Sequence, residues 1–396
     1  MSGAMLNLDE ARMMLSDIAE ALPPVELTLA DALGCRIARS PVSDVSLPPS
    51  HVSAMDGYAV RHDDLEPGVS LPVAFEITAG KVPEPLPTGA ATRIFTGAVL
   101  PDGADTVIPQ ELATVADDGR VLLERLELGA HVRRRSEVLS AGQTLAAEGD
   151  LVTPQRMALL AAGGAHRLQV VPRPSVAVVV TGSELVPPSA VPGPGQIRNT
   201  NGPLLDGLVR ACGLASPAQL AAVDSERELV EALRSALSSA DLVLTSGGVS
   251  VGDYDLVPDA VRSLGGEVVF HRVAVKPGKP VLAARVGRRW LLGLPGNPVS
   301  VLVSWWLFGR PLAAALAGDR GGFVDGWITA GLEEAVEVRG GRVEVRPAVL
   351  AAGPRVRAIS WKGSHDLAAA AAANALVRLD ARREYRAGEE VTCIPI

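Results

Sequence analysis

Residues 242–250 have the sequence LVLTSGGVS, in which a short apolar run is followed by a glycine-rich turn. The same order recurs at residues 176–184 (VAVVVTGSE) and 291–298 (LLGLPGNP). An unbroken apolar run of this length is typical of a strand in a parallel sheet, which is covered on both faces. Such strands, alternating with helices, predict an α/β domain with a three-layer αβα sandwich over about residues 175–316.

Helical patterns fill the segments between these runs. Ser225 and Glu228 form an S-x-x-E capping box, and the apolar residues that follow share one helical face. Asn297, as an N-cap, and Pro298 after it begin a further predicted helix that runs to Leu316. Two more helices are predicted at residues 203–212 and 257–264.

Other segments flank the predicted α/β domain. Residues 8–22 carry apolar side chains at helical spacing. Residues 42–145 consist of short β-branched runs separated by proline and glycine, which predicts a small β-rich domain. Thr153 and Pro154 then have the order of an N-cap and a first helical residue. Residues 328–396 alternate apolar and polar, which fits a small β-barrel or sandwich, so the predicted fold class is multidomain, α/β plus β.

Composition excludes several classes of protein. A length of 396 residues predicts about two to four domains. The net charge of −8 argues against a nucleic-acid partner, because such proteins usually carry a basic excess. No apolar run is long enough to span a bilayer, and the first residues do not resemble a signal peptide, so we expect no membrane partner. Three distant cysteines, Cys35, Cys212 and Cys393, form neither a disulfide framework nor a zinc motif, which indicates a reducing, cytoplasmic setting.

The three glycine turns predict a site for an anionic ligand. Ligands of open parallel sheets bind beyond the carboxyl ends of the strands. Glycines there let backbone N–H groups approach a phosphate, and the N-terminus of the next helix adds partial positive charge. The residues predicted to bind a phosphate-bearing ligand are Thr181, Gly182, Ser246, Gly247, Gly248, Val249, Ser250, Pro295, Gly296, Asn297 and Pro298.

Charged residues near these turns extend the prediction. Lys276 and Lys279 flank a proline-glycine turn, which could simply be solvated but which, in the same domain as three glycine turns, favours oxyanion binding. Asp253 and Asp255 follow the second glycine turn. They either help to hold Mg²⁺, which commonly bridges carboxylates and phosphates, or cap the helix that follows.

Four motifs carry a family resemblance. They are SAMDGYAV at residues 53–60, TSGGVSVGDYD at 245–255, KPGKP at 276–280 and GLPGNP at 293–298. On these motifs, essentially the whole chain resembles the MoeA family of molybdopterin molybdenumtransferases, and it is similar to the E-domains of gephyrin and of its plant homologues.

The resemblance implies a four-domain, elongated homodimer. A linking domain would be assembled from residues 1–45 and 142–172, and the β-rich insert domain would span residues 46–141. A three-layer, MogA-like molybdopterin-binding domain would follow at residues 173–318, and a C-terminal β-barrel at residues 319–396.

The reaction implied by the resemblance is the insertion of molybdate into the dithiolene of adenylylated molybdopterin, with release of AMP and with Mg²⁺ as cofactor. These substrates agree with an anion site, because molybdopterin carries a phosphate, its adenylylated form carries a pyrophosphate, and molybdate is an oxyanion. A MogA-like adenylyltransferase and molybdoenzyme chaperones are further partners that the resemblance implies.

The resemblance also implies roles for charged residues of the α/β domain. Glu184 and Asp255 would position Mg²⁺ or the pyrophosphate, and these two carboxylates are the predicted metal ligands. Lys276 and Lys279 would neutralise molybdate or pyrophosphate oxygens.

Two other domains would complete the site. Arg346 and Ser364, in the last domain, match positions similar to the molybdate contacts of the family. Asp56 and Thr96 would close the cleft from the insert domain of the other subunit. The predicted catalytic set is Asp56, Thr96, Glu184, Asp255, Lys276 and Lys279.

Two residues depart from the family pattern. Val138 stands where the family commonly has an aspartate, and Asn199 replaces the aspartate of an I-x-D-T/S-N pattern. Both changes remove negative charge, and they favour an alternative in which the protein is a non-catalytic molybdopterin- or cofactor-binding protein or a scaffold of the same fold. The adenylyltransferase reaction is a third interpretation, which explains the glycine turn at Ser246 but not the insert or the C-terminal barrel.

Overall fold

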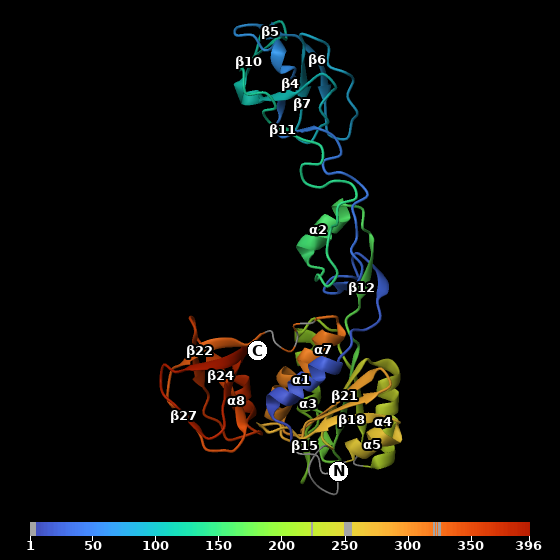
Figure 1. The fold of residues 1–396 in the computed structure, drawn as a ribbon, viewed down its shortest axis with the longest axis vertical. Helices are drawn as coiled ribbons and strands as arrows, with labels where there is room; N and C mark the ends of the chain where they lie inside the picture. Colours follow the sequence, from blue (N-terminus) through green and yellow to red (C-terminus); the bar gives the residue numbers. More distant parts are fainter. Residues whose placement is uncertain (1–4, 223–224, 249–255, 320, 322, 324–325) are drawn as a thin grey trace. The chain divides into compact units, whose positions relative to one another are not determined.

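The structure is a computed structural model, and it describes residues 5–222, 225–248, 256–319, 321, 323 and 326–396. The chain divides into two compact units (Figure 1). The larger unit comprises Met1–Val25, Gly34–Arg36 and Val171–Ile396, and the smaller unit comprises Glu26–Leu33 and Ile37–Val170. Four candidate site residues lie outside the described residues, namely Val249, Ser250, Asp253 and Asp255.

A six-stranded sheet lies at the centre of the α/β domain. In spatial order its strands are β16 (Ala218–Ala222), β13 (Val176–Thr181), β17 (Leu242–Ser246), β21 (Arg289–Leu294), β20 (Leu282–Val286) and β18 (Glu267–His271). The first four are parallel, as predicted. Strand β20 instead runs antiparallel to both of its neighbours. Its pairing with β21 is antiparallel because Gly287 and Arg288 form a two-residue hairpin loop between them.

Helices cover both faces of this sheet, which confirms the three-layer αβα sandwich. Along β13, Val176, Val178 and Val180 face one hydrophobic core, and Ala177 and Val179 face the other. The first core includes residues of α1 (Leu8–Ile18), α3 (Asn201–Ala211), α6 (Pro298–Ser304) and α7 (Arg310–Leu316). The second core includes residues of α4 (Glu226–Ser239), capped by Ser225 as predicted, and α5 (Val257–Ser263) (Figure 1).

The last helix of the α/β domain is interrupted, unlike the continuous helix that the sequence predicts. A π-helical turn, η3 (Trp305–Gly309), separates α6 from α7. Pro311 lies in the first turn of α7 and has no N–H to donate to the carbonyl of Leu307, four residues earlier. The guanidinium of Arg12, which is 8% exposed, donates to that carbonyl instead, at 2.6 Å.

The segment Pro298–Leu316 has the length and the apolar composition of a membrane-spanning helix. However, 78% of its most apolar window is buried inside the structure. It packs against the central sheet, as the core helix of an α/β domain does.

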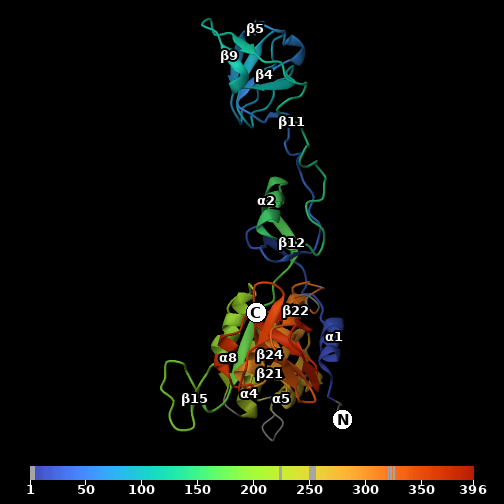
Figure 2. The same cartoon turned by 90° about the vertical axis from the view of Figure 1, so that its left-hand side faces the viewer.

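The C-terminal part of the larger unit contains a closed five-stranded barrel, which confirms the predicted β-barrel. Its strands are β24 (Val343–Leu350), β25 (Arg355–Ala358), β22 (Ile328–Leu332), β28 (Glu390–Pro395) and β26 (Ala375–Leu379), and β26 pairs with β24 to close the ring (Figure 2). Strand β19 (Val275–Lys276), from the α/β domain, pairs with β24. The remaining elements here are β23 (Val336–Val338), β27 (Arg383–Tyr385) and α8 (Leu367–Ala371).

The smaller unit is rich in β-structure, as predicted. A four-stranded sheet contains β6 (Val73–Ile77), β7 (Ala91–Ile94), β4 (Gly57–Val60) and β8 (Thr106–Pro109). Around it lie β3 (Val52–Ser53), β5 (Ser70–Leu71), β9 (Ala113–Val115), β10 (Val121–Leu123), β11 (Val132–Arg133), η1 (His62–Asp64) and η2 (Gln110–Leu112). A separate three-stranded sheet contains β1 (Val25–Thr28), β12 (Arg167–Val171) and β2 (Arg36–Ile37). Helix α2 (Pro154–Ala162) begins after Thr153, whose side chain caps it as predicted.

Candidate functional site

The carboxyl ends of three parallel strands lie side by side in the α/β domain. Val180 of β13 is paired with Ser246 of β17, and Ser246 is paired with Leu294 of β21. The three glycine turns therefore begin at the same edge of the sheet, as the sequence predicts. A cleft with a volume of about 690 Å³ lies at this edge.

Most of the predicted binding residues of the α/β domain line this cleft. Those that do so are Thr181, Gly182, Glu184, Ser246, Gly247, Gly248, Gly296, Asn297 and Pro298. Pro295 is buried and is not among the lining residues, because it lies between the end of β21 and the exposed Gly296.

The turn after β17 requires glycine for a specific reason. Gly247 has a φ of +96°, and a Cβ there would lie 2.5 Å from Oγ1 and 2.8 Å from the carbonyl oxygen of Thr181. Only glycine allows such a close approach between the two strand ends. The N–H of Gly247 donates to the carbonyl oxygen of Leu294 at 3.2 Å. Because the N–H of Gly247 already donates to Leu294, a ligand at this point of the turn must be bound by other hydrogen-bond donors.

A loop that the sequence analysis did not assign to the site forms one wall of the cleft. It joins β14 (Leu185–Val186) to β15 (Ile197–Arg198), which pair with each other, and it extends from the α/β domain (Figure 2). Arg198 lines the cleft, and its Nε donates to the carbonyl oxygen of Ala190 at 2.9 Å. The run of prolines and glycines at residues 187–195 signals a loop, but nothing local connects that loop with the glycine turns.

Asn201 is the last residue of the I-x-D-T/S-N pattern, and the sequence alone assigned it no role. It is the first residue of α3, is 8% exposed and lines the cleft. Its Nδ2 donates to Ser246 Oγ and to the carbonyl oxygen of Gly296, each at 2.7 Å. Because α3 begins here, the positive end of its helix dipole faces the cleft.

The barrel contributes a further wall. Asn297 Nδ2 donates to Ser364 Oγ at 2.9 Å, and the N–H of Val299 donates to the carbonyl oxygen of Ser364 at 3.1 Å. Asn297 is the N-cap residue of α6 and Pro298 follows it, as predicted, but the Asn297 side chain makes no capping hydrogen bond to the helix. His365 and Leu367, on either side of Asp366, line the cleft.

Three predicted cationic residues do not line the cleft. Among the described residues, its lining includes neither Lys276, Lys279 nor Arg346. Lys276 and Arg346 instead bind one carboxylate, that of Glu344, whose side chain is 3% exposed. Lys276 Nζ lies 3.0 Å from Glu344 Oε1, and Arg346 Nε lies 2.6 Å from Glu344 Oε2. Glu344 is not among the predicted site residues, although its place two residues before Arg346 in an alternating strand puts both side chains on one face.

Asp56 and Thr96 form a pair within the smaller unit. Asp56 Oδ1 accepts hydrogen bonds from the N–H of Thr96 at 2.7 Å and from its hydroxyl at 2.8 Å. These two donors, first the backbone and then the side chain, lower the pKa of Asp56 below its ordinary value of 3.8. The role of this pair in closing the cleft stays a prediction.

The cleft lining offers one carboxylate among the described residues, that of Glu184. It lies close to the turn after β13, since a Cβ on Gly182 would be 2.7 Å from Glu184 Oε2. No group of three histidine, cysteine, aspartate or glutamate side chains able to hold a metal ion occurs in the part of the chain that the structure describes. A metal ion held here would therefore depend on oxygens of the substrate as well.

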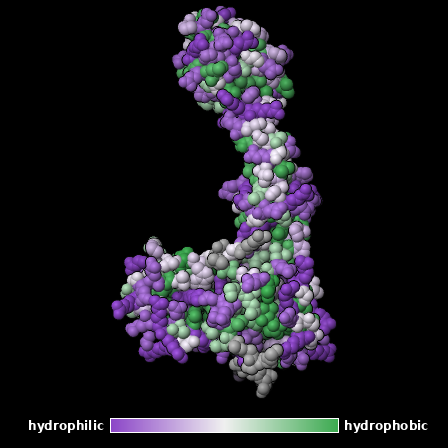
Figure 3. Space-filling model, viewed as in Figure 1, coloured by the Kyte–Doolittle hydropathy of each residue, from purple (hydrophilic) through white to green (hydrophobic). Residues whose placement is uncertain are grey.

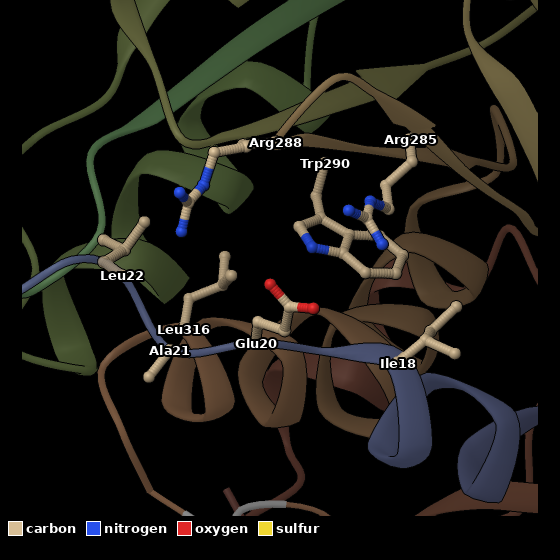
Figure 4. A pocket seen from close by; sticks show the side chains of 8 residues that line it. All are labelled: Ile18, Glu20, Ala21, Leu22, Arg285, Arg288, Trp290 and Leu316. Atoms are coloured by element: carbon tan, nitrogen blue, oxygen red, sulfur yellow. The ribbon is translucent and has the colours of Figure 1, made fainter.

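A second cavity lies at the opposite end of β21 and is too small for a substrate. Its volume is about 20 Å³, room for about one water molecule. Figure 4 shows the carboxylate of Glu20 in this cavity, with Arg285, Arg288 and Trp290 around it. The lining carries charges of both signs, from Glu20 and from the two arginines, and the volume is far below that of a phosphate-bearing substrate.

Comparisons with known proteins agree with this arrangement. Residues 6–164 match the MoeA N-terminal region (domain I and II), residues 177–315 match a probable molybdopterin binding domain, and residues 329–396 match the MoeA C-terminal region (domain IV). The chain is 39% identical to molybdopterin molybdenumtransferase 2 of Mycobacterium tuberculosis over 318 residues, and this region covers 78% of each protein.

Two further similarities extend over almost the whole chain. One is to the molybdopterin molybdenumtransferase of Haemophilus influenzae, which is 35% identical over 408 residues, 99% of this chain and 98% of that protein. The other is to the crystal structure of the MoeA molybdopterin biosynthesis protein of Pyrococcus horikoshii, with a TM-score of 0.83 and 30% identity over 99% of each chain. The protein therefore belongs to the MoeA family.

Proposed function

We propose that this protein is a molybdopterin molybdenumtransferase of molybdenum cofactor biosynthesis. It inserts molybdenum from molybdate into adenylylated molybdopterin and releases AMP. The observation that carries the proposal is the cleft at the carboxyl ends of β13, β17 and β21, in the segment that matches a molybdopterin binding domain. Relatives that are 35% and 39% identical are named molybdopterin molybdenumtransferases, which favours the enzyme over a non-catalytic paralogue.

The cleft offers donors for the phosphates of such a substrate. The N-terminus of α3, the Ser246 hydroxyl and the guanidinium of Arg198 lie in its wall. Together they supply a helix dipole, a neutral hydrogen-bond donor and a full positive charge. An oxygen nucleophile then attacks a phosphorus of the phosphoanhydride, the bond from that phosphorus to the bridging oxygen breaks, and AMP is released. These groups stabilise the negative charge that develops on the departing phosphate.

The proposed cofactor is Mg²⁺, and the donor set of the cleft fits it. Mg²⁺ is usually held by one or two carboxylates together with substrate phosphates and water. Glu184 is the carboxylate in the lining that would hold it, and Asp255, outside the described residues, is the second proposed ligand. When bound, the ion would neutralise charge on the phosphoanhydride.

Molybdate is the proposed second substrate. On the strength of the family resemblance, we propose that molybdate is bound by Lys276, Lys279, Arg346 and Ser364. Two observations support a role near the junction of the α/β domain and the barrel: Lys276 and Arg346 share the carboxylate of Glu344, and Ser364 contacts Asn297 at the edge of the cleft.

We also propose that the protein is a homodimer. Hydrophobic residues gather on the surface of the larger unit over α1 and α3 (Figure 3). Among the exposed hydrophobic side chains on or beside α1 are Met5 and Met13, which are 43% and 62% exposed. Exposed apolar patches commonly mark protein–protein contacts. In such a dimer the insert domain, with Asp56 and Thr96, would close the cleft of the partner.

Other proteins are proposed as further partners in the cytoplasm. A MogA-like adenylyltransferase would act before this enzyme, and molybdoenzyme chaperones would act after it.

Turnover by the purified protein tests the proposed reaction. The assay combines adenylylated molybdopterin, Mg²⁺ and molybdate, and follows AMP release together with reconstitution of a cofactor-free molybdoenzyme. Molybdate-dependent AMP release with an active reconstituted enzyme is the expected result. Tight binding of the adenylylated pterin without AMP release would show a non-catalytic paralogue. In the variant Asp255→Asn, retained AMP release would rule out the role of that carboxylate.

A further inference from the structure

Asn201 connects two of the three turns that form the cleft. Its Nδ2 lies 2.7 Å from the carbonyl oxygen of Gly296, in the turn after β21. The same nitrogen lies 2.7 Å from Oγ of Ser246, at the end of β17. The side chain is therefore held at both points, and the residue is 92% buried, since its exposed fraction is 8%.

The carbonyl of Gly296 fixes which way the Asn201 amide faces. A carbonyl oxygen only accepts hydrogen bonds, so the amide atom beside it has to be the nitrogen. That nitrogen carries two hydrogens and accepts none, so its second contact makes Ser246 Oγ an acceptor. The hydrogen of the Ser246 hydroxyl must then point toward a different acceptor.

The other end of the Asn201 amide is a second, independent observation. Its Oδ1 is buried and has no hydrogen-bond partner among the described residues. A buried acceptor without a partner costs free energy, so stability alone would be better served by a side chain that is paired at both ends. The free-energy cost of the unpaired Oδ1 is explained if Nδ2 of Asn201 is required at its place beside Ser246 and Gly296.

We propose that Asn201 is a positioning residue that holds the Ser246 hydroxyl as a hydrogen-bond donor to a phosphate oxygen of the substrate. This inference rests on the proposed function and deepens it. Both residues line the cleft, and the neighbouring amide of Gly247 is already bonded to Leu294, which leaves the Ser246 hydroxyl as a donor at this point of the turn. The pterin phosphate and the adenylyl phosphate offer the same oxygen chemistry.

A double-mutant cycle measures whether Asn201 acts through Ser246. Dissociation constants are measured by calorimetry for Asn201→Ala, Ser246→Ala and the double variant. The ligands are AMP, which carries only the adenylyl phosphate, and molybdopterin, which carries only the pterin phosphate. We expect each single variant to weaken the binding of one of the two ligands about tenfold, the loss of one hydrogen bond to a charged group. The double variant should bind no more weakly than Ser246→Ala alone.

Asn199 provides the matched control. It lines the same cleft, but its Oδ1 accepts from the N–H of Gly202 at 2.9 Å, and it makes no described contact with Ser246. The effect of Asn199→Ala should therefore add to that of Ser246→Ala. Adenosine, which has no phosphate, should bind equally to the wild type and to Asn201→Ala.

The ligand that shows non-additivity identifies the phosphate. Non-additive losses with AMP assign the bond to the adenylyl phosphate, and with molybdopterin to the pterin phosphate. Additive losses with both ligands would overturn the proposal. A wild type that binds neither ligand and releases no AMP would contradict the proposed function itself, whereas an active wild type with additive losses contradicts only the role of Asn201.

A pair of isosteric variants covers the case in which Asn201→Ala does not fold. In Asn201→Asp, the carboxylate would accept the Ser246 hydrogen and divert it from the phosphate. Asn199→Asp adds the same charge to the same wall without contacting Ser246. Phosphate ligands should therefore lose about tenfold more affinity in the first variant than in the second, and equal losses would overturn the proposal.

Discussion

Lys276 of the α/β domain donates a hydrogen bond from Nζ to Oε1 of Glu344 in the barrel, at 3.0 Å. The two residues face each other because β19 pairs with β24, with Lys276 opposite Glu344. The second oxygen of Glu344 accepts from Arg346. One buried carboxylate therefore holds two of the cations that we propose for molybdate, and it fixes them relative to each other.

Replacing Glu344 by glutamine should lower the free energy of unfolding of the larger unit by about 1–3 kcal/mol. Removing one partner leaves the mostly buried guanidinium of Arg346, 18% exposed, without its counter-charge. The loss is smaller than for a fully buried pair, because the Lys276 side chain is 45% exposed and water screens it. Urea unfolding followed by tryptophan fluorescence measures the change.

Glu337→Gln is the control for this variant. Glu337 pairs with Arg339 in the same C-terminal part of the chain, but their side chains are 52% and 85% exposed. Its removal should leave the free energy of unfolding unchanged within error. Equal values for the two variants would mean that the ion pairs of Glu344 contribute nothing to stability.

Gly247→Ala should destabilise the α/β domain by about 2–4 kcal/mol. An alanine at a φ of +96° is strained, and its Cβ would come within 2.8 Å of the carbonyl oxygen of Thr181, which belongs to the backbone and cannot turn away. Gly296→Ala is the matched control in the same cleft, because a Cβ there meets nothing within 4 Å. It should change the free energy of unfolding by no more than about 0.5 kcal/mol. Similar losses in both variants would show that the tight contact with Thr181 is not the cause.

The α/β core could be predicted from the sequence because its signals are local. Apolar runs at β13, β17 and β21 and the glycines after them depend only on neighbouring residues. The antiparallel strand β20 and the break in the last helix were missed. The carbonyl of Leu307, which Pro311 leaves without an N–H donor, is bonded by Arg12, almost 300 residues away in the sequence.

The polar part of the site was harder to predict for the same physical reason. Asn201 joins groups 45 and 95 residues away, and Glu344 joins a lysine 68 residues away. Asn297 had the local signal of a helix cap, but contact with the barrel draws its amide to Ser364. Tertiary contacts decide the hydrogen-bond partners of such side chains, whereas local sequence decides where a glycine turn occurs.

Thr96→Val should raise the pKa of Asp56 while leaving it below its ordinary value of 3.8. Valine removes the hydroxyl donor, but the backbone N–H of Thr96, the larger cause of the low pKa, remains. Because the folded-state pKa of Asp56 is depressed, the ionised carboxylate stabilises the fold above pH 3.8, and this stabilisation is lost as the pH falls through the folded-state pKa. In the variant the two pKa values lie closer together, so the pH range over which stability is lost should be narrower. NMR titration of the Asp56 carboxyl measures the shift, and Asp366, whose pKa is lowered by the N–H of Lys362, is the internal control. An unchanged pKa of Asp56 would mean that the Thr96 hydroxyl does not contribute to lowering it.

Arg198→Ala should raise KM for adenylylated molybdopterin about tenfold, which corresponds to about 1.4 kcal/mol. Arg198 is the one arginine or lysine in the cleft lining as far as the structure describes the chain, and its loss removes an ion pair with phosphate. Because Arg198 is also proposed to stabilise the negative charge that develops on the departing phosphate, kcat should fall as well. Because Nε of Arg198 also holds the loop through Ala190, Arg198→Lys should restore only part of the affinity.

Arg234→Ala distinguishes direct contact from long-range attraction. Arg234 is exposed on α4 and does not line the cleft, and its removal changes the net charge of the protein by the same amount. An effect on KM in Arg198→Ala alone, which weakens as the salt concentration rises, is the result expected of a phosphate contact. Equal effects of the two substitutions would mean that overall charge steers the substrate and that Arg198 does not bind it directly.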